Sequence, residues 1–283
     1  MAELLYEIRG PKTLMEMTWP EVESLSKETD IALMSIGACE QHGHHLPLGT
    51  DTIQSTETLK YAHGILLKEY GVKCLIAPTI PWGINPGAMC YPGSLTVSTR
   101  TLIALLEELC EGLYNHGFKK IVLFLGHDEN YGSMMVAAQN LVTKYSDIKV
   151  VVLNPMPALK ASERASLDLT AKKRPDAHAG AGETSRALCL YPNLTYIDRA
   201  QDDGWVYSGE DVCETIIGGE PPLMGGGVYN PADEGRGFSR ERGDAGQTGD
   251  PALADAEAGR KAYAAMGRVI AQVVCKLFVT VGK

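Results

Sequence analysis

Four short runs of apolar residues alternate along the chain with longer segments in which apolar residues recur every three or four positions. The short continuous runs are typical of buried strands, and the periodic segments are typical of helices. The predicted strands span residues 31–37, 74–80, 120–125 and 149–153. The predicted helices span residues 19–27, 52–70, 99–116, 131–145 and 252–278. This alternation predicts an α/β fold with a mostly parallel sheet covered by helices on both faces.

Local signals mark several helix ends. Thr18 and Glu21 form the pattern of a capping box at the start of the first helix. Gly71 and Gly117 stand where the second and third helices should stop. Residues 217–251 hold ten glycines and are expected to form either a long functional loop or an oligomer contact. Since no boundary is evident elsewhere, we expect a single domain over residues 1–283.

Composition then narrows the possible partners. The net charge is −9 and no basic stripe is visible, so nucleic acid is not an expected partner. The apolar runs are far shorter than the roughly 18 residues that a membrane helix needs, so no membrane segment is expected. The seven cysteines are scattered without a C-x-x-C pair, which indicates reduced thiols. With no signal-peptide core near the N-terminus, these features predict a cytoplasmic protein.

Two clusters of metal-type side chains follow the first and third predicted strands, at the ends where ligands bind in parallel sheets. The first lies in ACEQHGHHLPLGTD and the second in LGHDEN. The candidate ligands are Glu40, His42, Asp51, His127 and Glu129. Three carboxylates and two imidazoles suit two divalent ions that share a bridging carboxylate. A single histidine at a strand end is usually an ordinary polar residue, but two clusters at matching strand ends favour a metal site.

A third polar block, DAHAGAGETS, begins another helical segment. By itself it would be a capped helix start with a spare histidine. Beside a metal centre, His178 on a glycine-rich loop becomes a candidate general acid/base. Glu183 could orient His178 or meet a metal-bound water, or it could simply place favourable charge in the first turn of the helix.

Other residues near these motifs are less strongly indicated as members of the site. His45 is expected to support the site from behind, and His44 is expected to be exposed. His63 and His116 lie in helices without partners and are not expected in the site. The loop at residues 91–94 faces the same sheet edge and either lines the pocket or is a plain turn.

In their order and spacing, the three motifs resemble the creatininase (creatinine amidohydrolase) family, and the block GDPALADAEAGRKAY fits it as well. The resemblance covers nearly the whole chain. It implies a three-layer α/β/α sandwich, a centre of two divalent metal ions and a homo-oligomer, commonly a hexamer. By motif position it implies that one ion is held by Glu40, Asp51 and His127. The other would be held by His42, Asp51 and Glu129, with His178 as the acid/base.

These parts predict a metal-dependent hydrolase in which a water activated by two ions attacks a substrate carbonyl. The metals could be Zn, Mn, Co or Fe, since mixed nitrogen and oxygen sites accept all of them. The substrate is expected to be a small cyclic molecule, and the scissile bond is either an amide C–N bond or a C–C bond. The second possibility follows relatives thought to open 3-dehydro-scyllo-inosose. A metal-binding protein without turnover is the alternative from another class, against which His178 argues.

The aromatic residues depart from the family pattern. Creatinine-hydrolysing members are expected to carry tryptophans before the position of His178, where they pack around a flat ring. The three tryptophans of this chain are elsewhere, at Trp19, Trp82 and Trp205. The corresponding segment, residues 154–177, instead carries Lys160, Arg164, Lys172, Lys173 and Arg174. These cations either form a solvated helix face or supply hydrogen-bond donors to a polar substrate, which predicts poor activity on creatinine itself.

Overall fold

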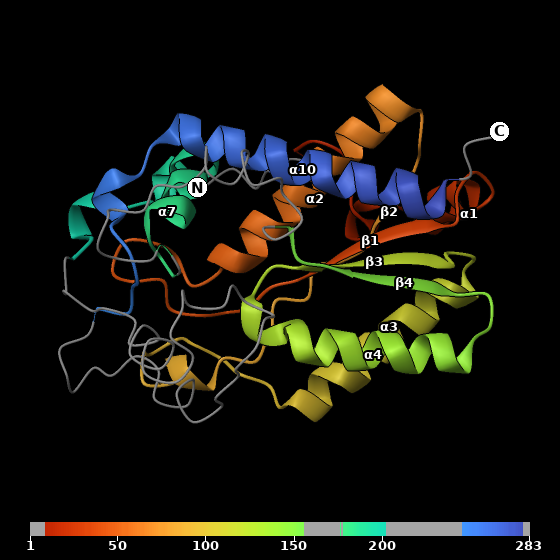
Figure 1. Ribbon diagram of the computed structural model, residues 1–283, viewed down its shortest axis with the longest axis horizontal. Coiled ribbons are helices and arrows are strands. Elements are labelled where there is room, and N and C mark those ends of the chain that lie inside the picture. The colour runs from red at the N-terminus through yellow and green to blue at the C-terminus, as the bar shows by residue number, and fades with distance from the viewer. Residues whose placement is uncertain (1–8, 156–175, 177, 202–244, 280–283) are drawn as a thin grey trace, which may run out of the picture.

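Four parallel strands form the centre of the fold in the computed structural model, in the order β2-β1-β3-β4 (Figure 1). They are β1 (Ile31–Ile36), β2 (Leu75–Ile76), β3 (Lys120–Leu125) and β4 (Lys149–Leu153). The structure describes residues 9–155, 176, 178–201 and 245–279. Of the glycine-rich stretch at 217–251, only residues 245–251 are within the described part.

Helices cover the sheet on both faces (Figure 1). The principal helices are α1 (Trp19–Ser26), α2 (Thr50–Tyr70), α3 (Thr99–Asn115), α4 (Tyr131–Lys144), α7 (Ala181–Leu190) and α10 (Ala256–Phe278). Short 3-10 turns occur at Leu14–Glu16, Pro86–Ala88, Asp128–Asn130, Pro192–Leu194, Ile197–Arg199 and Pro251–Leu253. The helices α2 and α10 lie on one face of the sheet, and α3 and α4 lie on the other. This arrangement is the three-layer α/β/α fold that the motifs implied.

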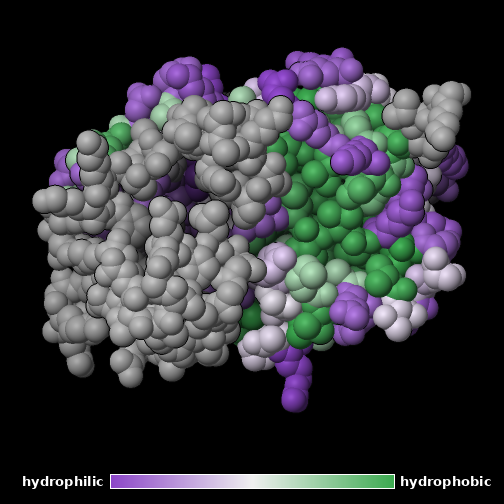
Figure 2. Space-filling view, in the orientation of Figure 1, coloured by the Kyte–Doolittle hydropathy of each residue, from purple (hydrophilic) through white to green (hydrophobic). Residues whose placement is uncertain are grey.

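Two apolar cores follow from the alternation of side chains along each strand. Met34 and Leu123 point to the α3–α4 side, while Leu33 and Val122 point to the α2–α10 side. Every residue of β1 is buried, as expected for a strand covered on both faces. Figure 2 shows the apolar surface gathered over the sheet edge between α10 and α4, with polar side chains around it.

The predicted helix ends are confirmed at three places. Thr18 and Glu21 make both bonds of the capping box before α1. Gly71 ends α2 with a φ of +65°, and Gly117 follows α3 with a φ of +98°. Both values lie in the left-handed region that glycine tolerates without strain. No helix in the described ranges is long and apolar enough to span a membrane.

Two elements are shorter than the sequence predicted. The strand expected over residues 74–80 pairs with β1 only at Leu75–Ile76, followed by an isolated bridge at Ile80. Pro78 lies between these two points and has no N–H to donate to a ladder. The last helix begins at Ala256 rather than at residue 252, because Asp255 is its N-cap and accepts a hydrogen bond from the Ala258 N–H.

The contact between α7 and α10 depends on a glycine. A Cβ added at Gly259 of α10 would lie 2.1 Å from the carbonyl oxygen of Ser185 in α7. The Asp255 N–H donates to Ser185 Oγ at 2.9 Å in the same contact. Ser185 lies in α7, two residues after Glu183. The close approach of the two helices therefore also sets the position of the start of α7.

Gly259→Ala should therefore destabilise the protein. The added methyl group meets rigid backbone, so we expect a loss of about 1–3 kcal/mol in the free energy of unfolding. Gly112→Ala in α3 is the matched control, since a Cβ there would meet nothing within 4 Å. The free energy of unfolding of this control should increase by about 0.5–1 kcal/mol, because alanine has a better helix propensity than glycine. Urea unfolding measures both, and equal stability of the two variants would contradict the proposed packing constraint.

Candidate metal centre

The two polar clusters meet because β1 and β3 are adjacent and in register. Ile36 pairs with Leu125, so both strands end at the same level of the sheet. Glu40 and His42 follow the first strand end, and His127 follows the second. The parallel ladder thus brings together side chains that are more than 80 residues apart in sequence.

Asp51, in the first turn of α2, lies between the two histidines. Its Oδ1 is 3.1 Å from His42 Nε2, and its Oδ2 is 3.2 Å from His127 Nδ1. Glu40 Oε2 is 3.1 Å from the same His127 Nδ1. A carboxylate with one oxygen facing each imidazole has the geometry needed to bridge two ions.

Backbone carbonyls orient both imidazole rings. His42 Nδ1 donates to the Glu40 carbonyl oxygen at 3.0 Å, so its Nε2 faces Asp51. His127 Nε2 donates to the Ile84 carbonyl oxygen at 2.8 Å, so its Nδ1 faces Glu40 and Asp51. Metal-binding histidines are usually held in this way, with one ring nitrogen fixed and the other left for the ion.

The carboxylate oxygens have the character of metal ligands. Glu40 and Asp51 are each only 5% exposed, and Glu40 Oε2 and Asp51 Oδ2 have no hydrogen-bond partner of acceptable geometry. Buried carboxylate oxygens are costly unless they are paired or bound to a cation. Their ligand atoms and those of His127 lie within 4.8 Å of one another. The donor set therefore fits a divalent ion.

Strong electrostatic coupling accompanies this arrangement. Burial lowers the pKa of His42, but the carboxylates of Asp51 and Glu183 outweigh it and raise this pKa to about 10. Burial likewise opposes the positive charge of His127, yet nearby Glu40 raises its pKa well above the usual range. Burial raises the pKa of Asp51, but His42 and His127 bring it far below its ordinary value. The positive charge of the protonated histidines thus compensates the negative charge of the carboxylates. Bound cations would take the place of those protons.

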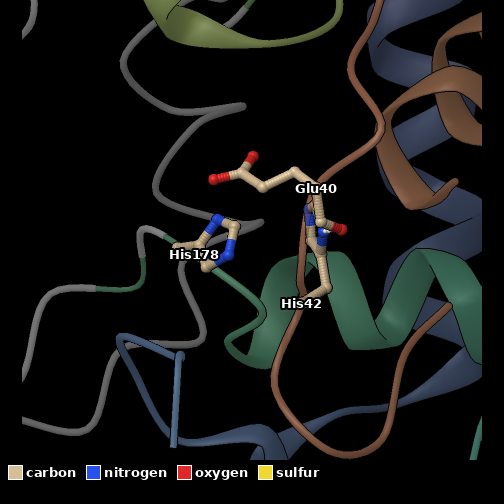
Figure 3. Close-up of side chains that lie close together, drawn as sticks. All are labelled: Glu40, His42 and His178. Carbon is tan, nitrogen blue, oxygen red and sulfur yellow. Dashed lines mark hydrogen bonds between the residues drawn. The ribbon is translucent and has the colours of Figure 1, made fainter. Parts of the chain in front are cut away.

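His178 reaches this centre from the opposite side of the site (Figure 3). Its Nε2 lies 2.7 Å from the Gln41 carbonyl oxygen and 3.0 Å from Gln41 Nε2. Its ring centroid is 4.4 Å from that of His42. The backbone of His178 pairs with Thr248, which ties the loop to the segment before α10. His178 is therefore held by both its backbone and its ring.

The loop that carries His178 is strained at the next residue. Ala179 has a φ of +50°, the only positive value for a non-glycine residue in the described part of the chain. Such backbone strain tends to occur at functional sites. Asp176 supports the turn by accepting a hydrogen bond from the Gly182 N–H at 2.8 Å. A Cβ at Gly180 would lie 2.0 Å from Asp176 Oδ1, which explains the small residues of this motif.

Glu183 faces the centre from the first turn of α7. Its Oε2 accepts the Ala179 N–H at 2.7 Å and lies 3.7 Å from His42 Nε2. The ligand atoms of His42, Asp51 and Glu183 are all within 4.8 Å of one another. Both interpretations of Glu183 thus find support, since it is close to the site and also sits in a helix first turn.

Glu129 stands apart from that group. Its Oε2 lies 3.9 Å from His127 Nε2, the nitrogen turned away from Asp51. This oxygen is buried and has no hydrogen-bond partner. Among the described residues, no group of side chains placed to hold an ion includes Glu129. Its role as a metal ligand remains a prediction.

The neighbouring residues behave mostly as expected. His45 is fully buried behind the site and shares a 2.9 Å hydrogen bond with Thr184 Oγ1, while burial lowers its pKa to about 4. His44 is exposed. In the 91–94 loop, Ser94 Oγ accepts the Gln41 N–H at 3.0 Å, so the loop supports the motif from behind.

Sequence reasoning missed Gln41 and Thr248. Gln41 lies between two candidate ligands and is buried against His178. Its position in the motif was a possible signal, but nothing in the residue type indicated a contact 137 residues away. Thr248 carried no signal, because its contribution is a backbone pairing. The cationic residues at 160, 164 and 172–174 lie outside the described ranges.

Comparison with known proteins shows the family and the fold of the chain. The sequence profile of the creatininase family, described as creatinine amidohydrolase, matches residues 15–274. The chain belongs to the creatininase family. Its fold agrees as well, because a crystal structure of creatinine amidohydrolase superposes with a TM-score of 0.72 at 23% identity, over 95% of this chain and 98% of that one.

Three curated relatives within the family differ in activity. Creatinine amidohydrolase of Pseudomonas putida is 29% identical over 66% of this chain and 75% of its own length. The 3-dehydro-scyllo-inosose hydrolase of Thermotoga maritima is 26% identical over 66% of this chain but only 58% of its own length. The mycofactocin precursor peptide peptidase of Mycobacterium ulcerans is 26% identical over 88% of this chain and 82% of its own. All are hydrolases, so family membership indicates a hydrolase and leaves the substrate open.

Replacement of Asp51 tests the bridging geometry. Asp51→Ala should lose both ions, because its two oxygens face the two candidate sites. Metal content per chain, measured on protein purified without chelator, gives the result. Asp51→Asn keeps the shape of the side chain and separates loss of charge from loss of packing. Asp147→Ala on the surface is the control and should retain the wild-type content. Full metal content in Asp51→Ala would rule out a bridge.

Proposed function

We propose that this creatininase-family hydrolase uses two divalent metal ions to open a small, polar, cyclic substrate. The observation that carries the proposal is the position of Asp51, with one oxygen facing His42 and the other facing His127. Glu40 and His127 would hold one ion together with Asp51, and His42 would hold the other with Asp51 and, by motif position, Glu129. Solved creatininases include a manganese form and a mutant of the Zn–Zn type, which makes these two metals the first to test.

The bound ions would lower the pKa of a shared water towards neutrality and polarise the substrate carbonyl. The chain itself contributes orientation and proton transfer. His42 and His127 keep their ring nitrogens aimed at the ions because backbone carbonyls fix their other nitrogens. His178 holds a proton at Nε2 against the Gln41 carbonyl oxygen, and its ring stands beside His42. His178 would pass a proton to the nitrogen or carbon that is released from the carbonyl carbon when the ring bond breaks.

The burial of the charged side chains also favours catalysis at this site. Glu40, His42 and Asp51 are almost completely buried, so charges there act in a medium of low dielectric constant. Fixed charges in such a site stabilise developing charge without reorganising when the reaction occurs. The strained backbone at Ala179, next to His178, favours a catalytic role over metal storage, because such strain tends to occur at functional sites.

A second candidate is hydrolysis of a C–C bond in an oxidised cyclitol such as 3-dehydro-scyllo-inosose. Two observations favour it: the similarity to the Thermotoga maritima hydrolase, and the lack of tryptophan in residues 154–177. A flat, weakly polar ring gains much of its binding from aromatic stacking. A hydroxylated ring would gain more from the lysines and arginines of that segment.

His178→Ala should slow turnover without loss of metal. The expected decrease in kcat is roughly 10²–10⁴-fold, the usual contribution of a general acid/base. Metal content and the urea midpoint should stay at wild-type values. His44→Ala, an exposed histidine of the first motif, is the matched control and should keep its activity. If His178→Ala lost an ion, the residue would be a ligand rather than an acid/base.

Steady-state kinetics on a substrate panel tests the choice of substrate. We expect poor hydrolysis of creatinine and higher kcat/KM on a polyhydroxylated cyclic ketone or a polar cyclic amide, in manganese or zinc. Efficient creatinine turnover without activity on the inosose would contradict this expectation. Cleavage of a linear peptide alone would place the chain with the mycofactocin peptidases instead. A fully loaded protein inactive on the whole panel would favour a non-catalytic metal-binding role.

A further inference from the structure

We propose that a chain of four side-chain hydroxyls anchors the start of α2 to the end of the sheet and thereby positions Asp51. Its members are Ser55 and Thr56 of α2, Ser35 of β1, and Thr79, which lies beyond β2. The inference rests on the proposed function only for its consequence at Asp51, because the anchoring of the helix can be measured without metal.

Ser35 is the polar exception in β1. The other residues of this strand are apolar, and all six are buried. A strand covered on both faces is normally a continuous apolar run, and a buried hydroxyl is costly unless it is hydrogen-bonded. Because side chains alternate along a strand, Ser35 faces the same side as Leu33, towards α2, at the last such position before the strand ends. A serine at this position therefore requires hydrogen-bond partners.

Short distances connect the four hydroxyls in series. Ser55 Oγ donates to Ser35 Oγ at 3.2 Å, and Ser35 Oγ lies 2.7 Å from Thr79 Oγ1. Thr79 Oγ1 is in turn 2.6 Å from Thr56 Oγ1, which donates to the Thr52 carbonyl oxygen at 2.6 Å. A carbonyl oxygen can only accept and each hydroxyl has one proton, so Thr79 must donate to Thr56 and Ser35 to Thr79. The chain thus runs in one direction, leaving α2 at Ser55 and returning to it at Thr56.

This series joins three elements that are far apart in sequence, namely β1, the segment after β2, and α2. Thr79 comes beside Ser35 because the Ile80 N–H donates to the Ser35 carbonyl oxygen at 2.9 Å. Hydrogen bonds in a chain polarise one another, so the series holds its members more firmly than isolated bonds would. Removal of an inner member leaves both a donor and an acceptor without partners, which costs more than the bond itself.

Two glycines allow α2 to come close enough for these bonds. A Cβ added at Gly37, directly after β1, would lie 2.8 Å from the backbone nitrogen and from Oγ1 of Thr52. A Cβ added at Gly126, directly after β3, would lie 2.8 Å from Oγ of Ser55. Side chains at either position would push the helix away from the sheet. Thr52 Oγ1 also donates to the Ala38 carbonyl oxygen at 3.0 Å, which ties the helix to the loop after β1.

The anchored residues lie directly beside Asp51 along the helix. Asp51 precedes Thr52, and Ser55 lies one turn further on. Serine and threonine are weak helix formers, so the hydroxyl chain rather than helix propensity explains their presence in these turns. A functional side chain must be held within about 0.5 Å of its working position by the groups around it. The hydroxyl residues are thus positioning residues, since they act through the helix turn that carries Asp51.

Thr79→Val tests the chain, because valine keeps the shape of threonine and removes its hydroxyl. In metal-free protein, hydrogen exchange of the backbone amides at residues 54–56 should become about 5-fold faster or more, the effect of losing one typical hydrogen bond. Zinc affinity, measured by calorimetry, should fall by roughly 10–100-fold, the range found for groups that hold a metal ligand in place. Thr79→Ser keeps the hydroxyl and should match wild type in both measurements.

Ile65→Val controls for a plain loss of stability. Ile65 lies in the core further along α2 and takes no part in the hydroxyl chain. Its substitution should lower the urea midpoint but leave the zinc affinity at the wild-type value. Zinc affinity is measured far below the unfolding transition, so a role of the hydroxyls in stability alone would not change it either.

Wild-type zinc affinity in Thr79→Val would overturn the inference, with or without faster exchange, while the proposed function would stand. Equal losses in Thr79→Val and Thr79→Ser would also overturn it, because packing rather than the hydroxyl would then matter. If wild-type protein bound neither zinc nor manganese, the proposed function would fail, and the exchange rates alone would decide whether the chain anchors α2. If Thr79→Val does not fold, Ser35→Ala replaces it, since Ser55 can then turn its proton to the Thr52 carbonyl oxygen, 3.4 Å away. Faster exchange and weaker zinc binding are again expected.

Discussion

The burial of two carboxylates, Glu40 after β1 and Asp51 at the start of α2, is the constraint on which this site depends. Glu40 and Asp51 are almost completely removed from water, and isolated charges there would be very costly. His42 and His127 supply the compensating charge, which is why their pKa values rise despite their burial. The same donor set fits a divalent cation, and two of its carboxylate oxygens have no hydrogen-bond partner. The surrounding structure serves to keep these groups together.

Two packing features maintain that geometry from opposite sides. Parallel pairing of β1 with β3 brings the first two motifs to one level of the sheet. The close approach of α7 to α10 at Gly259 sets the position of the third motif. Asp51 and Gln54 on α2 connect the two sides, since one contacts both histidines and the other bonds to the start of α7. A site assembled from four elements is sensitive to packing far from its own residues.

The relatives show how one scaffold can serve several hydrolases. Creatinine, an oxidised inosose and a precursor peptide are the substrates named for three of them. The metal-type residues lie after the strand ends and on α2. One fold can carry sites that act on different molecules, so the shared scaffold does not by itself fix the substrate.

The sequence alone determined the order of strands and helices along the chain and most of their ends, and it predicted most of the residues proposed for the site. Continuous apolar runs and glycine stops act locally, so they can be recognised without knowing the fold. The pairing of β2 was less predictable, because Pro78 interrupts it within an otherwise apolar run. Placing Glu40 and His127 at one point required only the rule for parallel strand ends.

Tertiary structure alone decided how these residues face one another. Glu129 follows His127 by two residues and Glu183 follows His178 by five, but the sequence does not show how close either glutamate lies to His42 and Asp51. Their difference appears only when α7 packs on α10 and the ring of His127 turns its Nδ1 towards Asp51. Likewise, Gln41 meets His178 through a contact that spans 137 residues. Such contacts depend on the packing of whole elements and on side-chain orientation, which the residue types in a motif do not specify.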